Sequence, residues 1–139
     1  MGQLVRFGVS MDAELLAAFD GLIRQKGYAN RSEAIRDLVR DALVKTDWEQ
    51  DAGPVAAALC MVYDHHTPDL THRLTHMQHD FAENIVSTLH VHLSRHDCLE
   101  VVILRGMPSR LQKLADRLLS TRGVKHGRLM VTTAGQELP

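Results

Sequence analysis

The sequence predicts an α+β protein in which a β-α-α unit of about 45 residues precedes a β-α-β-β-α-β domain. A short alternating segment and two helical patterns of apolar residues come first, and a Gly-Pro break separates them from the rest. The composition is 45% hydrophobic and 24% charged over 139 residues, which is typical of a folded globular protein. We therefore expect two folded parts.

The N-terminal segment at residues 3–10 alternates like a strand. One isolated strand leaves its backbone groups unpaired, so we expect a second copy of the chain to pair with it. The resulting two-stranded ribbon would suit the major groove of DNA, where Arg and Ser donate to base edges. The inward side of the ribbon would carry Val5, Phe7 and Val9, and the outward side Arg6, Gly8 and Ser10.

Two helices follow this segment. Asp12 is placed to cap the first helix, and Gly27 ends it after an apolar stripe. Asn30 stands three residues before Glu33, which is a capping arrangement for a second helix that we expect to reach about Lys45. The free N–H groups at the start of that helix favour phosphate binding by the residues there: Asn30, Arg31 and Ser32.

The domain limits follow from a break in the helical pattern. We expect a DNA-binding part at residues 1–46, a linker at 47–54 and a second domain at 55–139. The second domain shows strands at residues 55–63, 85–93, 98–105 and 129–133, with helices at 69–84 and from Pro108 to Gly123. This order predicts a ferredoxin-like arrangement, in which both helices cover one face of a four-stranded antiparallel sheet.

A candidate metal site lies on the hairpin of this domain. His90 and His92 are two apart in a strand, so their imidazoles share one face, and Cys98 follows across a short polar loop. Two nitrogens and a sulfur form an incomplete metal site. We expect the two helices to cover the opposite face, which carries Leu89 and Val91.

The helix at 69–84 offers a further ligand. Its apolar residues Leu70, Leu74, Met77 and Phe81 fall on one arc, which must face the sheet, and the opposite arc carries His72, His76, His79 and Glu83. The helix histidines and the hairpin histidines are then both expected to face away from the core of their own domain. A helix histidine would therefore reach the hairpin site of a neighbouring chain.

The sequence also resembles a known family. Asp12-x-x-Leu15-Leu16, Gly27-Tyr28 and the run from Asn30 to Asp37 resemble a ribbon-helix-helix domain, and with the His/Cys pattern the chain resembles the nickel-responsive transcriptional regulators. The resemblance implies a sensing domain of the ACT type, one Ni(II) per subunit, and a cation held with the help of Glu33 and Asp37. The four implied nickel ligands are His90, His92 and Cys98 of one subunit and His79 of the opposing one.

The function implied by this resemblance is a metal-dependent repressor. Ni(II) would promote binding of a homotetramer, a dimer of dimers, to a double-stranded operator with two half-sites, and the regulated genes would be those for nickel uptake. The ligand set by itself leaves the metal open, because a planar site suits Ni(II) or Cu(II) and a tetrahedral site suits Zn(II). Gly8 departs from the expected hydrogen-bonding ribbon residue, so the operator sequence would differ accordingly.

Two other functions fit parts of the sequence. A ribbon-helix-helix regulator could instead sense a small molecule such as an amino acid, or another transition metal. A small zinc hydrolase with an open three-ligand site would leave the N-terminal part unexplained, so we expect no enzyme. The longest apolar run is too short to cross a membrane, and two cysteines make no disulfide framework. We expect a cytoplasmic protein.

Overall fold

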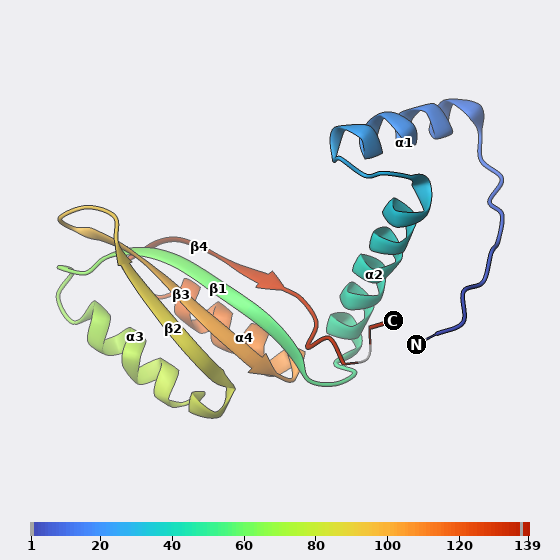
Figure 1. Ribbon diagram of the computed structural model, residues 1–139. Coiled ribbons are helices and arrows are strands. Elements are labelled where there is room, and N and C mark those ends of the chain that lie inside the picture. The colour runs from blue at the N-terminus through green and yellow to red at the C-terminus, as the bar shows by residue number, and fades with distance from the viewer. Residues whose placement is uncertain (1, 137) are drawn as a thin grey trace. The chain divides into compact units, whose positions relative to one another are not determined.

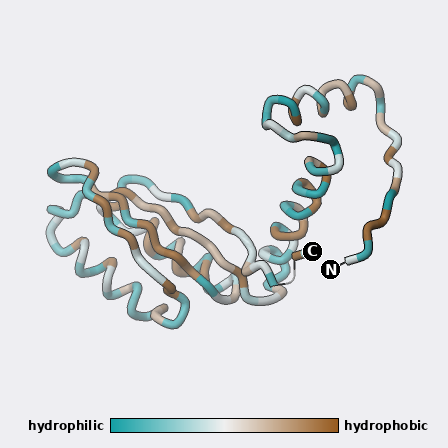
Figure 2. Tube along the Cα trace, viewed as in Figure 1, coloured by the Kyte–Doolittle hydropathy of each residue, from teal (hydrophilic) through white to brown (hydrophobic). Residues whose placement is uncertain are grey.

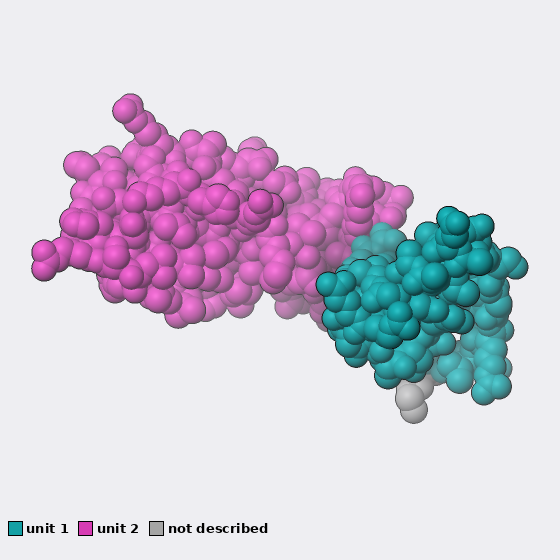
Figure 3. All heavy atoms as spheres, turned by 90° about the horizontal axis from the view of Figure 1, so that it is seen from above, with its two compact units in different colours: residues 1–43, 138–139 teal, residues 44–137 magenta. Residues whose placement is uncertain are grey.

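The computed structural model describes residues 2–136 and 138–139 and shows two compact units (Figures 1 and 3). The first unit includes the chain up to Leu43 together with Leu138 and Pro139, and the second unit begins at Val44. Across the described residues, no helix is both long enough and apolar enough to cross a membrane.

The first unit contains helix α1 (Ala13–Gln25) and most of α2 (Arg31–Gln50). Both predicted N-terminal caps are confirmed. The backbone N–H of Glu14 donates to Asp12 Oδ1 at 2.8 Å, and that of Glu33 donates to Asn30 Oδ1 at 2.9 Å. Gly27 follows α1 with a φ of 82°, a conformation that glycine adopts without steric cost.

Helix α2 is longer than predicted, because it ends at Gln50 rather than near Lys45. Trp48 in the added turn packs against the core of the second unit, and its indole Nε1 donates to the carbonyl oxygen of Thr132 at 2.9 Å. This tertiary contact accounts for the extension, since the sequence from Thr46 onward carries no apolar helical repeat.

The predicted strand at residues 3–10 is not formed in the single chain. A strand exists only through hydrogen bonds to a neighbouring strand, and the expected neighbour is a second copy. The apolar side chains of this segment are correspondingly open, with 74% of Val5, 75% of Phe7 and 60% of Val9 exposed. The first unit thus has apolar surface that its own residues do not cover.

The second unit has the predicted β-α-β-β-α-β order. Its antiparallel sheet has the strand order β2-β3-β1-β4, from β1 (Val55–Asp64), β2 (Ile85–His92), β3 (Asp97–Gly106) and β4 (Val124–Val131). Helices α3 (Leu70–His79) and α4 (Pro108–Leu119) lie on one side of this sheet (Figure 1). Helix α3 is shorter than predicted, because a turn and a 3-10 helix (Ala82–Asn84) replace its last part.

The core lies between the sheet and these helices. Alternate residues of β1 and β3 are buried, among them Leu59, Met61 and Val102, and they contact apolar side chains of α3 and α4. In Figure 2 the hydrophobic colour follows the strands, whereas α3 is largely hydrophilic. The opposite face of the sheet is also apolar but open, since 39% of Ile103 and 65% of Met130 are exposed.

Close packing of β4 against β1 gives a stability prediction at Gly127. A Cβ there would meet Leu119 Cδ2 and would lie 2.7 Å from the carbonyl oxygen of Cys60, a backbone atom that cannot move aside. We expect Gly127→Ala to lower the free energy of unfolding by about 1–3 kcal/mol, as overpacking does. Urea unfolding measures this change. Gly53→Ala is the control, because a Cβ there has no neighbour within 4 Å, and an equal loss in both variants would contradict the steric explanation.

Candidate metal centre and nucleic-acid surface

The pairing of β2 with β3 brings three predicted ligands together. His92 lies opposite Cys98, and His90 lies opposite Glu100. Residues directly opposite each other in antiparallel strands project from the same face of the sheet. His90, His92 and Cys98 therefore share one face, as the alternation along the sequence predicted for the two histidines.

The prediction about which face the helices cover is wrong. Cys98 and Glu100 are buried in the core, so His90 and His92 project from the same side of the sheet as α3 and α4. The exposed, uncovered face instead carries Leu89 and Val91. The prediction failed because β2 is an edge strand of a sheet whose second face is also apolar, so hydrophobicity along β2 does not identify the covered face.

Cys98 is completely buried at the start of β3. Its Sγ donates to the carbonyl oxygen of Tyr63 at 3.4 Å. Burial raises the pKa of the Cys98 thiol, a hydrogen bond with the Tyr63 side chain opposes this increase, and the nearby carboxylates of Glu100 and Asp97 add to it. The thiol is therefore protonated at neutral pH, and a metal cation has to displace that proton to use the sulfur as a ligand.

A buried hydrogen-bond network lies beside these residues. The Tyr63 hydroxyl donates to Glu100 Oε2 at 2.8 Å, and Gln78 Nε2 donates to Glu100 Oε1 at 3.2 Å. The Tyr63 ring also meets the His90 ring edge-on, with centroids 6.0 Å apart. Burial, and then the hydrogen bond to Glu100, raises the pKa of Tyr63. The network thus connects the ligand-bearing strands to the last turn of α3.

This network was not predicted from the sequence. Its signal was present in the sequence, because Glu100 occupies an inward position of β3 between Cys98 and Val102, where an apolar residue is expected. A carboxylate at such a position requires hydrogen-bond donors in the core. Tyr63 and Gln78 supply them, and their identity depends on the pairing of β1 with β3 and on the placement of α3.

His79, the fourth predicted ligand, is the last residue of α3 and is exposed. It is adjacent in sequence to Gln78, and among the described residues it takes no part in the ring contacts of the histidine cluster at the end of the hairpin. In that cluster the ring of His65 contacts those of His66 and His92, with centroids 4.3 and 5.1 Å apart, and His92 contacts His90 at 5.5 Å. The single chain places three of the four predicted ligands on one face of β2 and β3, although their ligand atoms do not all lie within 4.8 Å of one another.

These residues fit a transition-metal ion. Two imidazoles and a thiol are the donors that nickel, copper and zinc prefer, and the thiol is held at a fixed place in the core. His65 Nδ1 is buried and has no hydrogen-bond partner among the residues that the structure describes, and burial lowers the pKa of this imidazole. Among the described residues, however, the ligand atoms that all lie within 4.8 Å of one another belong to a different set, Asp64, His66 and His96.

The predicted DNA-binding residues lie in the first unit. Arg6, Gly8 and Ser10 are exposed in the N-terminal segment, and Ser32 is exposed at the start of α2. Asn30 caps this helix through its side-chain oxygen. The neighbouring predicted contact, Arg31, donates from Nε and Nη2 to the two carboxylate oxygens of Asp20, each at 2.8 Å.

The ion pair with Asp20 reduces the positive charge with which Arg31 can attract a DNA phosphate. The hydrogen bonds from Arg31 lower the pKa of Asp20, so the carboxylate stays ionised and neutralises much of the guanidinium charge. A phosphate at the start of α2 would then depend more on the backbone N–H groups of the helix than on this side chain. The pair also fixes the guanidinium against α1.

Glu33 and Asp37, the predicted secondary cation ligands, lie one turn apart on α2. Asp37 already has partners, because Oδ2 accepts from the Tyr28 hydroxyl at 2.8 Å and Oδ1 lies 3.5 Å from the Arg40 guanidinium. The Tyr28–Asp37 hydrogen bond raises the pKa of Tyr28. A cation at Asp37 would have to compete with Arg40 for this carboxylate.

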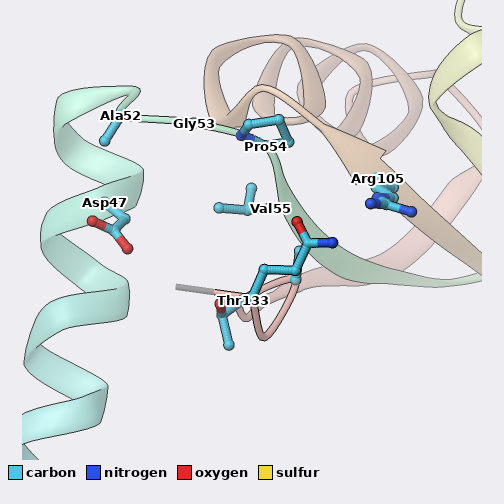
Figure 4. Close-up of a pocket in the computed structure, with 9 residues that line it drawn as sticks. Asp47, Ala52, Gly53, Pro54, Val55, Arg105 and Thr133 are labelled. Atoms are coloured by element: carbon cyan, nitrogen blue, oxygen red, sulfur yellow. The ribbon is translucent and has the colours of Figure 1, made fainter. Parts of the chain in front are cut away.

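A pocket of about 280 Å³ lies elsewhere in the second unit, between the end of α2 and the end of the sheet where β1 begins and β3 finishes (Figure 4). Asp47, Arg105 and Thr133 line it together with the Gly53-Pro54 turn. None of the predicted metal or DNA ligands lines this pocket, so it is not the predicted site.

Comparisons with known proteins identify both units. Residues 5–46 match the family described as "Ribbon-helix-helix protein, copG family", and residues 56–132 match the "NikR C terminal nickel binding domain". Proteins named as nickel-responsive regulators in Geobacter sulfurreducens and Desulfovibrio desulfuricans are 52% and 56% identical to this chain over 138 residues, which is 99% of each chain.

A solved structure supports the fold of the second unit alone. An uncharacterized protein from Thermotoga maritima aligns with a TM-score of 0.52 at 14% identity, covering 58% of this chain and 99% of that one. Together, the ribbon-helix-helix match, the nickel-binding-domain match and the full-length similarity show that the chain belongs to the nickel-responsive regulator family.

Proposed function

We propose that this chain is a cytoplasmic repressor whose residues 1–46 bind DNA and whose residues 55–139 sense nickel, with 47–54 as the linker. The observation that carries the proposal is the strand pairing that sets His92 opposite Cys98 and His90 opposite Glu100. Nickel abundance would then be converted into operator binding, and nickel uptake genes are the fitting targets because their repression limits further import.

We place one Ni(II) per subunit between two chains. His90, His92 and Cys98 of one chain supply three ligands, and His79 of another chain supplies the fourth. The exposure of His79 and its position outside the histidine cluster of its own chain support this assignment. When bound, the metal supplies a cross-link that holds α3 of one subunit to the hairpin of the next.

Assembly of four chains is supported by apolar surface in both units. In the first unit, exposed apolar side chains of the N-terminal segment and of both helices require a partner: Val5, Phe7, Val9, Leu15, Leu22, Leu38 and Val39. In the second unit, the open face of the sheet exposes Leu89, Val91, Ile103 and Met130. Two separate apolar surfaces on one chain are what a dimer of dimers needs.

The coupling of nickel to DNA is proposed to act through assembly geometry. Four chains hold two ribbon dimers, and an operator with two half-sites engages both only when their spacing is right. The hydrogen bond from Gln78 to Glu100 connects the end of α3, next to His79, to the hairpin. Ordering of the hairpin by the metal would therefore also order the end of α3. Nickel then favours the arrangement that binds both half-sites, and affinity rises through differential binding to that state.

The proposal is tested by DNA binding with and without nickel. Duplexes are first selected from a randomised pool by the full-length, nickel-loaded protein, and the enriched duplex is then titrated with metal-free and loaded protein in gel shifts. We expect tighter binding with Ni(II), by about 5- to 150-fold, the usual range of allosteric coupling. Failure to enrich a duplex, or equal affinity in both states, would refute the proposal.

Arg6 gives a prediction for the ribbon surface. It is exposed, and an arginine that contacts a guanine edge discriminates by about 1–3 kcal/mol, roughly 5- to 150-fold in affinity. We expect Arg6→Ala to weaken binding to the selected duplex by that factor and to relax its sequence preference. Arg24→Ala, in the last turn of α1, is the charge-matched control. A uniform loss on all duplexes in both variants would instead indicate nonspecific electrostatics.

A further inference from the structure

Three side chains with metal-binding donors converge beside the predicted nickel site without belonging to it. Asp64 ends β1, His66 follows it by two residues, and His96 lies in the loop between β2 and β3. One ligand atom from each residue lies within 4.8 Å of the other two. We propose that Asp64, His66 and His96 form a second site for a divalent first-row transition metal.

The spacing of the two imidazoles suits two ligands of one ion. Their Nδ1 atoms are 3.1 Å apart. Metal–nitrogen bonds of about 2.0–2.1 Å give that separation at an angle near 100°, between planar and tetrahedral coordination. Without an ion, this contact is a hydrogen bond only when one Nδ1 carries a proton and donates it to the lone pair of the other, unprotonated Nδ1. An ion between the two nitrogens would remove this restriction.

Backbone contacts hold the two loops that supply these ligands. The N–H of His65 donates to the carbonyl oxygen of His96 at 3.0 Å, and the Asp64 Oδ1 accepts from the N–H of His66 at 2.8 Å. The hydroxyl of Ser94 accepts from the N–H of His96 at 3.2 Å. The donors are thus brought together by contacts that do not depend on an ion, so little ordering would accompany binding.

The ligand atoms of this site differ from those of the predicted nickel site, because they include a carboxylate and no sulfur. Two imidazoles and one carboxylate, with no sulfur, suit Zn(II), Ni(II) or Cu(II) better than Mg(II) or Ca(II). The imidazoles are exposed, so water would complete the coordination. A metal bound here would lack the thiolate charge-transfer absorption expected from Cys98. That difference allows the two sites to be counted separately.

Equilibrium dialysis of the full-length protein against Ni(II) tests the proposal. We expect two equivalents per chain, of which one gives thiolate absorption and the other does not. His96→Gln and His66→Gln should each lower the affinity for the second equivalent by roughly 100-fold or more, at least the loss seen for outer ligand partners. His72→Gln, an exposed histidine of α3, is the matched control and should keep both equivalents.

A second measurement removes the predicted nickel ligands. The His90→Gln, His92→Gln, Cys98→Ser protein should keep one Cu(II) whose electron paramagnetic resonance spectrum shows two coupled nitrogens, and this signal should vanish when His96→Gln is added. Persistence of the signal in that protein, or retention of the second equivalent by the single His96 and His66 variants, would overturn the proposal. The thiolate absorption reports separately on the proposed nickel sensor, so either site can fail without the other.

Discussion

Cys98→Ala is expected to abolish the nickel response, so that the variant binds the selected duplex equally with and without Ni(II). Cys98 is the thiol donor of the proposed site, it is fully buried, and it lies opposite His92 in the sheet. Its loss leaves two imidazoles on an edge strand, which together with the partner's single histidine bind nickel more weakly. The ratio of the two DNA affinities should therefore fall from about 5- to 150-fold to about one.

Cys60→Ala is the matched control for this experiment. Cys60 is a half-buried free thiol of β1 that lies on the opposite face of the sheet from Cys98, so the variant loses a thiol without losing a ligand. It should keep the full nickel response. A Cys98→Ala protein that remains folded and still responds to nickel would contradict the assigned ligand, and it would favour a regulator that senses a different small molecule.

Mixing two inactive variants is expected to restore nickel binding. His79→Gln chains keep His90, His92 and Cys98, and Cys98→Ser chains keep His79. Alone, the His79→Gln protein should have sites that lack the fourth ligand, and the Cys98→Ser protein should have sites that lack the thiolate. In an interface between the two variants, one site has all four ligands and the other lacks two, so co-refolded mixtures should recover up to about half of the sites in each mixed interface.

The measured quantity is the thiolate absorption per chain after Ni(II) addition. The control is a mixture of His79→Gln with a His79→Gln, Cys98→Ser double variant, in which no interface contains His79. Recovery only in the first mixture would establish that the ligands come from different chains. Absence of recovery in both mixtures, despite mixed assemblies detected by native mass spectrometry, would contradict the site between subunits.

The sequence alone was sufficient for the order of elements in the second unit and for the starts of α1 and α2. Asp12 and Asn30 cap their helices as predicted because capping depends on side chains within three residues of each other. The β-α-β-β-α-β order was also readable, because it follows from local periodicity. His90 and His92 share a face for the same reason, since alternation is a property of any strand.

Tertiary structure decided which face of the sheet the helices cover, and local pattern predicted it wrongly. Both faces of the sheet are apolar, so only the pairing with β3, which sets His92 against Cys98, places the histidines on the helix side. The length of α2 likewise depends on Trp48, which packs against the core of the second unit and donates to the carbonyl oxygen of Thr132, far along the chain. The Asp64–His66–His96 set joins loops 30 residues apart, a contact that no periodicity along the chain encodes.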